Sequence, residues 1–300
     1  MKIRSAASLA TLLLSAAALV ACPGGNDNKQ DKPFISRLRN SAQPTGPISD
    51  TTAATSATVA ATAKTTKPDG AGATGGYGKG AIKGVVSFTG TAIEMKVPKK
   101  RKEADVCKDK EVMFNAVVVN DGKLKDVFIG IADEQLEGDY SSDKPVTIDQ
   151  RDCMYSPRIQ GAMVDQKLQI KNSDATTHNV NASLGSDVQF NKAQPKGATD
   201  IDASFEEPGI YRLKCDVHPW MRTFVVTTDN PFHAVSGADG SFNIGKVPDG
   251  KYKIVAWHAR YGQKEATVEI KGGAAVEANF SYDGTEKEPA ENAGELTDLF

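Results

Sequence analysis

The pattern of apolar and polar positions changes near residue 81, where short β-type runs separated by turn residues begin. Asn120-Asp121-Gly122 lies between the apolar runs 116–119 and 127–129, which is a typical hairpin signal. Further strands are expected at residues 82–88, 163–171, 201–205, 210–215, 223–228, 242–244, 252–257, 266–270 and 276–280. No segment shows sustained helical periodicity. The chain is therefore predicted to be all-β, with two packed sandwiches.

The N-terminus has the pattern of an export signal. Lys2 and Arg4 precede an apolar run, residues 6–21, that is too short to serve as a spanning helix between folded domains. The run ends in Leu19-Val20-Ala21-Cys22, which resembles the lipobox of bacterial lipoprotein precursors. This resemblance implies that residues 1–21 are removed and that Cys22 carries the lipid, so the protein is anchored to a membrane of the cell envelope. The alternative is an ordinary secretory leader with Cys22 as a spare thiol.

Residues 22–79 are predicted to be the lipid anchor and a disordered linker. The stretch 51–66 is almost wholly Thr, Ala and Ser, and residues 70–80 are rich in glycine. Such a composition cannot bury enough apolar surface to offset chain entropy. As a flexible coil the linker would reach about 40 Å on average. The acidic tail, residues 284–300, is also expected to be flexible.

The charge balance gives no support for a nucleic-acid partner. The net charge is −2 and 25% of the residues are charged, without the concentrated basic surface that nucleic-acid binding requires. The single basic run, residues 99–102, is predicted to be a solvated loop, with a contact for an acidic partner as the alternative.

Four side chains form a candidate metal site. Cys215, His218 and Met221 occur at three-residue spacing after a predicted strand, and His178 follows a loop upstream where a second strand end could deliver it to the same place. Two histidines and one cysteine with a weak axial methionine are the ligands of a blue-copper electron-transfer site. The predicted cofactor is one type 1 copper ion.

The same residues resemble a known family. Residues 215–226 look like the ligand loop and last strand of cupredoxins, most closely the amicyanin-like blue copper domains, and residues 172–180 resemble the family's first-ligand loop. The resemblance spans about residues 145–228. It implies that His178, Cys215 and His218 are equatorial ligands, that Met221 is axial, and that Asn172 braces the loop. Residues 112–143 do not match the family, which leaves the first strand of this domain open.

Alternatives to a copper site remain. The domain could be a cupredoxin fold that has lost copper or binds another metal. His233 and His258 have no partners at ligand spacing, so structural or surface roles are expected for both. Cys107 and Cys153 are expected to form a disulfide because exported cysteine pairs are normally bridged. If loop entropy dominates, such a bridge stabilises the fold by about 4 kcal/mol. Two free or metal-linked thiols are the alternative.

A second resemblance concerns the C-terminal region. Asp239-Gly240-Ser241-Phe242 and Pro248-Asp249-Gly250-Lys251-Tyr252 resemble strand turns of the carboxypeptidase-regulatory-like, transthyretin-like β-sandwich. The predicted domains are accordingly a cupredoxin-like Greek-key sandwich at residues 80–228, with its core at 145–228, and a smaller sandwich at 229–283. The run 81–90 looks like the usual first strand of the second family, so the cupredoxin could be inserted into that sandwich.

The functional expectation is a lipid-anchored carrier of single electrons, and catalysis is the least expected role because the metal is already fully ligated. His218 is the expected electron port, and Pro219 and Trp220 the expected apolar docking rim. The expected partner is a redox protein such as a cytochrome. Two alternatives are a carbohydrate- or protein-binding module with structural or vestigial copper, and periplasmic copper storage or delivery.

Overall fold

The computed structural model describes residues 76–93, 106–108, 110, 117–132, 136 and 140–286. All of these described residues belong to one compact unit. Their regular elements are all β-strands, which confirms the predicted all-β class. The described residues include no helix with the length and apolarity needed to cross a membrane. The predicted leader, Cys22, the linker up to residue 75, the basic run and most of the acidic tail lie outside the described residues.

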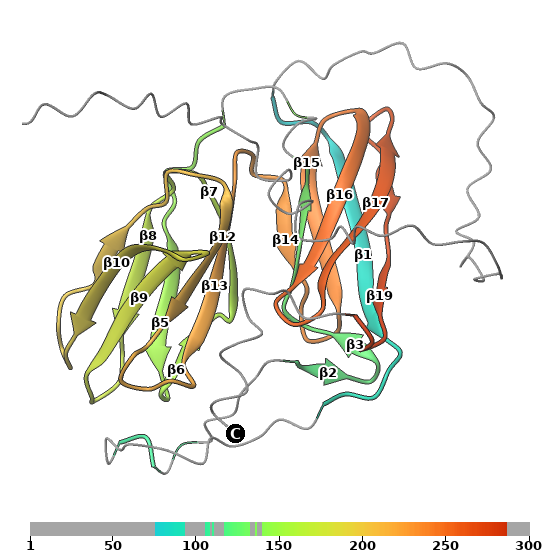
Figure 1. The fold of residues 1–300 in the computed structure, drawn as a ribbon. Helices are drawn as coiled ribbons and strands as arrows, with labels where there is room; N and C mark the ends of the chain where they lie inside the picture. Colours follow the sequence, from blue (N-terminus) through green and yellow to red (C-terminus); the bar gives the residue numbers. More distant parts are fainter. Residues whose placement is uncertain are drawn as a thin grey trace, which may run out of the picture. The chain divides into compact units, whose positions relative to one another are not determined.

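The first sandwich consists of two sheets that enclose one core (Figure 1). One sheet has the order β10 (Asp187–Gln194), β9 (His178–Leu184), β12 (Gly209–Lys214), β13 (Arg222–Thr228) and β7 (Ile159–Met163). The other has the order β11 (Ile201–Ala203), β8 (Leu168–Asn172), β5 (Val146–Arg151) and β6 (Met154–Ser156). In β12, Tyr211 and Leu213 are buried and their neighbours are half-buried, because successive side chains point to opposite faces.

The second sandwich is built around β1 (Gly80–Phe88), shown in cyan in Figure 1. One sheet has the order β15 (Ser241–Val247), β1, β3 (Lys123–Leu124) and β2 (Val119–Asn120), and β18 (Ala275–Glu277) and β19 (Phe280–Tyr282) also pair with β1. The other sheet has the order β14 (His233–Val235), β4 (Val127–Ile131), β16 (Gly250–His258) and β17 (Gly262–Ile270). The core between the two sheets includes Ile82 and Val86 of β1.

The sequence-based division placed residues 80–228 in the cupredoxin-like domain, with the alternative that the run 81–90 belongs to the second sandwich. The strand pairings place both that run and residues 127–131 with the second sandwich. Strand β1 belongs to the second sandwich, where a Cβ added at Gly84 would clash with the carbonyl oxygen of Ala278. Strand β4 also belongs there, because it pairs with β14 and β16. The first sandwich, β5 to β13, therefore lies in the sequence between two strands that pair with each other, as an insertion in the second.

The Asn120-Asp121-Gly122 turn is present, but it joins different strands from those predicted. Asp121 and Gly122 have φ values of 48° and 70°, as a tight hairpin turn requires. The turn pairs β2 with β3, through Val119 opposite Leu124, whereas residues 127–129 lie in the opposite sheet. The sequence therefore predicted the turn correctly. It did not predict which strand follows the turn in the same sheet, because that depends on residues far away in the sequence.

An apolar cluster joins the two sandwiches. It contains Phe224 and Val226 of β13 together with Phe128 of β4 and Trp257 of β16. The rings of Phe224 and Trp257 meet edge to face with their centroids 5.5 Å apart. His233 lies against β7, where a Cβ added at Gly161 would clash with Cδ2 of the imidazole. Glycine at position 161 therefore lets the two sandwiches pack closely at this point.

His233 and His258 are expected to make the fold sensitive to acid. Burial lowers the pKa of His233 to about 4, and burial together with Arg158 and Arg260 lowers the pKa of His258 to about 3. Below pH 6.5 the unfolded chain binds protons at both histidines before the folded chain does. The free energy of unfolding should therefore fall as the pH drops from 6.5 toward 4, by up to about 1.4 kcal/mol per pH unit for each histidine.

Urea unfolding of the wild type and of His233→Gln, at about pH 6.5 and about pH 5, measures this effect. The variant starts from a lower stability at the higher pH, because it disturbs a packed ring. Its further loss between the two pH values should be smaller than that of the wild type. Equal losses in the two proteins would show that His233 does not resist protonation in the fold.

Candidate metal centre

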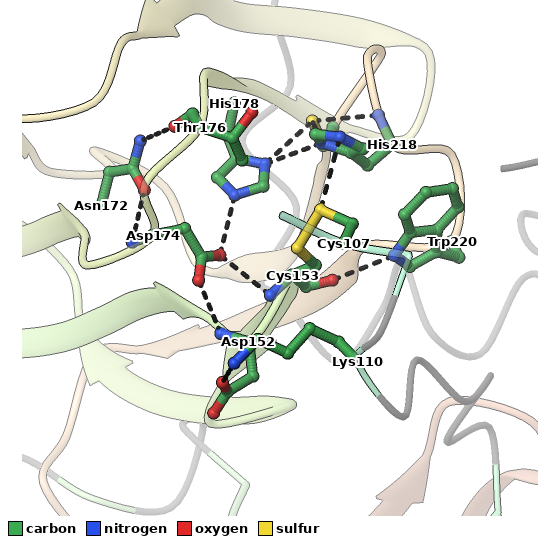
Figure 2. Close-up of a disulfide and its surroundings, with 11 residues drawn as sticks. Cys107, Lys110, Asp152, Cys153, Asn172, Asp174, Thr176, His178, His218 and Trp220 are labelled. Atoms are coloured by element: carbon green, nitrogen blue, oxygen red, sulfur yellow. Dashed lines mark hydrogen bonds and ion pairs between the residues drawn. A yellow bond between two sulfur atoms is a disulfide. The ribbon is translucent and has the colours of Figure 1, made fainter. Parts of the chain in front are cut away.

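Strand pairing brings the two predicted ligand segments together. Strand β9 begins at His178, and it runs antiparallel to β12, whose last residue, Lys214, lies opposite Asn181. Cys215 follows directly, and the loop 215–221 then leads into β13. The N-terminal end of one strand and the C-terminal end of its neighbour therefore meet at the same end of the sheet, where Figure 2 shows His178 and His218 facing each other.

The donor atoms of His178, Cys215 and His218 converge on one point. The two Nδ1 atoms are 2.8 Å apart, and the Cys215 sulfur lies 4.0 Å from Nδ1 of His178 and 3.8 Å from Nδ1 of His218. Among the described residues these three side chains form a group that could hold a metal ion, with donor atoms within 4.8 Å of one another. All three are at most 1% exposed. The arrangement is a buried site with one sulfur and two imidazole nitrogens.

The surroundings of Cys215 favour its thiolate. Its sulfur accepts hydrogen bonds from the backbone N–H groups of Asn179, at 3.5 Å, and His218, at 3.3 Å. Burial acts to raise the pKa of the thiol, but the hydrogen bonds from the two histidine rings and these two N–H groups outweigh burial and lower the pKa to about 6. Because the thiolate is the form that binds metals, the site favours the charge state a metal needs.

The loop that carries the ligands is closed by its own backbone and by Asn179. The N–H of Cys215 donates to the carbonyl of Met221 at 3.2 Å, and the N–H of Met221 donates to the carbonyl of His218 at 2.9 Å. Asn179 Oδ1 accepts the N–H of Asp216 at 2.6 Å. Met221 is fully buried in the same core cluster as Cys215. The role of its sulfur as an axial ligand stays a prediction.

Asn172 lies where the sequence predicted a brace for the first-ligand loop. Its side-chain amide donates to the carbonyl of Gln194 at the end of β10. The same amide donates to the carbonyl of Thr176, and Oδ1 accepts the N–H of Asp174 (Figure 2). These bonds tie the end of β8 to the residues immediately before His178. They therefore hold the loop that delivers the first imidazole.

Asp174 was not identified from the sequence, although it lies four residues before His178. Its Oδ2 is 2.9 Å from His178 Nε2, and its two oxygens accept the backbone N–H groups of Asp152 and Cys153. Burial acts to raise the pKa of Asp174, but the bonds from His178 and these N–H groups outweigh it and lower the pKa. A carboxylate on the distal nitrogen orients the His178 ring and increases its basicity. With the ring in this orientation, Nδ1 points toward the donor atoms of Cys215 and His218.

Removal of this carboxylate is expected to weaken metal binding. Asp174→Asn should lower copper affinity about 10- to 100-fold, because the ring of His178 loses a charged partner that fixes its orientation. Competition against a chromogenic copper chelator measures the change. Asp202→Asn is the matched control, since Asp202 pairs with Lys167 on the exposed surface of the same sandwich. Equal affinities in the two variants would show that Asp174 does not support the site.

Cys107 and Cys153, predicted to be bridged, form a disulfide in the structure, with an S–S distance of 2.03 Å. The bridge lies beside the proposed metal ligands: the Cys107 sulfur is 3.8 Å from His218 Nε2. Trp220 donates its indole N–H to the carbonyl of Cys153 at 3.0 Å (Figure 2). The sequence offered no signal that the bridge and the ligand loop would be neighbours.

Two expectations for the rim of the site need correction. His218, the expected electron port, is 0% exposed, and its outer nitrogen faces the disulfide. Trp220, expected on the docking rim, is 2% exposed because its indole nitrogen is bonded to the β5–β6 turn. Of the expected rim only Pro219 is exposed. Val217 provides further apolar surface there, at 47% exposure.

Comparisons with known proteins give matches to solved structures alone. No protein family model and no curated protein matches this chain. A purple cupredoxin from Nitrosopumilus maritimus is 23% identical over 27% of this chain and 98% of its own, with a TM-score of 0.25. A reduced variant of amicyanin is 26% identical over 29% of this chain and 86% of its own, with a TM-score of 0.26. A copper-containing nitrite reductase from Thermus scotoductus is 21% identical over 29% of this chain and 23% of its own, with a TM-score of 0.25.

Proposed function

We propose that this protein is a type 1 copper protein that carries single electrons at the bacterial cell envelope. The observation that carries the proposal is the buried convergence of His178, Cys215 and His218. Two imidazoles and a thiolate in a near-trigonal set, with a methionine in the same loop, are the donors that copper electron-transfer sites use. The two N–H groups on the sulfur and the lowered pKa of the thiol suit this ligand set.

Bound copper would supply a centre that alternates between Cu(I) and Cu(II). The residues around it keep the donor atoms in one arrangement during that change. Asp174 fixes the His178 ring, and the Asn179 side chain ties β9 to the loop that carries Cys215. A fixed donor set reduces the rearrangement that accompanies each electron. The packed β-scaffold thus favours rapid electron transfer.

The burial of the ligands supports a carrier over a catalyst. All four proposed ligands, Met221 included, are at most 1% exposed, so a substrate would have no direct access to copper held by them. A redox protein, a cytochrome being one candidate, would dock on the exposed surface at Val217 and Pro219. Weak electron-transfer encounters of this kind need only a small interface. A lipid on Cys22 and the linker 23–79 would hold the domain near the membrane.

The visible spectrum and voltammetry of the full chain test this function. The oxidised protein loaded with one equivalent of copper should show a strong thiolate-to-copper band and a reversible one-electron wave. A protein that binds copper tightly yet stays colourless after oxidation would contradict the proposal. A coloured protein with no reversible wave would favour copper storage or delivery instead.

A further inference from the structure

The disulfide next to the proposed copper site places two more sulfur atoms beside the same histidines. Cys107 Sγ is 3.8 Å from His218 Nε2. Among the described residues, the donor atoms of Cys153, Asp174 and His178 form a second group within 4.8 Å of one another that could hold a metal ion. In Figure 2 the two sulfurs lie between the His218 ring and the carboxylate of Asp174. Sulfur, imidazole and carboxylate donors thus gather on the side of the rings away from Cys215.

The fold holds Cys153 in place by bonds that do not involve its sulfur. Its N–H donates to Asp174 Oδ2 at 2.9 Å, and its carbonyl accepts the indole N–H of Trp220 at 3.0 Å. Asp152 and Cys153 have positive φ values of 55° and 58°, so they form a tight turn between β5 and β6. This turn is tied to Asp174 by two backbone N–H groups. The position of Cys153 is therefore set by the hairpin and by Asp174.

Cys107 is also tied to this hairpin by a contact besides the disulfide. Its carbonyl accepts the N–H of Lys110 at 3.3 Å, and the Lys110 ammonium pairs with the Asp152 carboxylate at 2.6 Å (Figure 2). Both cysteines are at most 1% exposed. With the S–S bond reduced, two buried thiols would remain next to each other in a dry environment. This is a preorganised dithiol.

We propose that the reduced Cys107–Cys153 pair is a second copper site, which binds Cu(I). Soft thiolate ligands select Cu(I), and the pair can hold it from two sides. Because both sulfurs are at most 1% exposed, the structure must open locally before an external dithiol can reach the disulfide. The exchange then transfers two electrons and two protons from that dithiol to the disulfide, and the dithiol becomes a disulfide. Binding of Cu(I) then forms two S–Cu bonds and releases two protons. The distal nitrogens of the histidines lie within reach of the bound sulfurs. Closing the disulfide removes the site.

The second site does not require Cys215, which allows it to be tested separately. The experiment uses the full chain as Cys215→Ala, in the oxidised form and after anaerobic reduction with a phosphine, with reduction of both cysteines verified by mass spectrometry. Cu(I) is titrated in competition with a chromogenic Cu(I) chelator. The matched control is the triple variant Cys107→Ala, Cys153→Ala, Cys215→Ala, which keeps Cys22 and all the histidines. Circular dichroism of the metal-free proteins checks that each is folded.

The reduced Cys215→Ala protein should bind one more Cu(I) than its oxidised form, and phosphine should change nothing in the triple variant. Equal stoichiometry in the reduced and oxidised Cys215→Ala protein would overturn the proposal, as would a triple variant that binds as much Cu(I) as the reduced one. If Cys215→Ala does not fold, wild type gives the same test, with two Cu(I) expected when reduced and one when oxidised. A colourless oxidised wild type would contradict only the electron-carrier function.

Discussion

Replacement of Cys215 by alanine should abolish the visible band and the one-electron wave of the copper-loaded protein. Charge transfer from the thiolate to copper produces the band. The soft thiolate also favours Cu(I), while the imidazoles suit Cu(II), so together they stabilise both oxidation states. The sulfur accepts hydrogen bonds from two backbone N–H groups in a buried site. No other side chain can take the place of this sulfur. The histidines remain, so some copper binding should persist without colour.

Absorption spectra of wild type and variant, recorded at equal copper content, measure this effect. Val188→Ala is a suitable control, because Val188 is 63% exposed on the edge strand β10 and should leave the band unchanged. A Cys215→Ala protein that keeps the band would mean that another sulfur is the ligand. The site would then have to be assigned to a thiolate other than that of Cys215.

Removal of the disulfide should cause the largest loss of stability. The double variant Cys107→Ala, Cys153→Ala should lower the free energy of unfolding by about 4 kcal/mol, because the unfolded chain gains the freedom of a loop with a sequence separation of 46 residues. The cost is expected to fall on the first sandwich, since Cys107 and Cys153 both pack in its core cluster. Alanine avoids placing an unpaired hydroxyl in that cluster.

Urea unfolding of the metal-free proteins measures the loss. Wild type unfolded in the presence of a phosphine reductant should approach the stability of the variant, since both then lack the cross-link. A variant as stable as the oxidised wild type would show that the bridge contributes nothing to the fold. In that case its place beside His218 would have to serve another purpose.

The ligand set could be predicted because its signal is local. Three of the four proposed ligands lie in one short loop, and His178 begins a strand, so few residues decide whether they meet. The contacts of Asp174 with Cys153 and of Cys107 with His218 join segments far apart in the sequence. Nothing in the spacing of those residues indicates that they are neighbours. The buried position of Trp220 was missed for the same reason.

The division into sandwiches shows a similar limit. Strand β1 alternates as a strand of either sandwich would, so its periodicity predicts a strand but not its partners. Only its resemblance to the first strand of the transthyretin-like family indicated the second sandwich. Its place in the second sandwich follows from the close approach of Gly84 to Ala278 and from pairing with β15, far along the chain. Likewise, the residues after the Asn120-Asp121-Gly122 turn continue past a short hairpin into the opposite sheet. The local sequence pattern therefore predicts that a segment is a strand, whereas long-range packing determines which sheet the strand joins and which strands it pairs with.

X-ray absorption at the copper edge, on the oxidised full chain loaded with one copper, tests most directly whether His178, Cys215 and His218 share one metal. The account predicts one short copper–sulfur bond and two copper–nitrogen bonds from imidazole, with the sulfur lost in Cys215→Ala. A copper ion surrounded only by nitrogen and oxygen, with no sulfur at bonding distance, would contradict it.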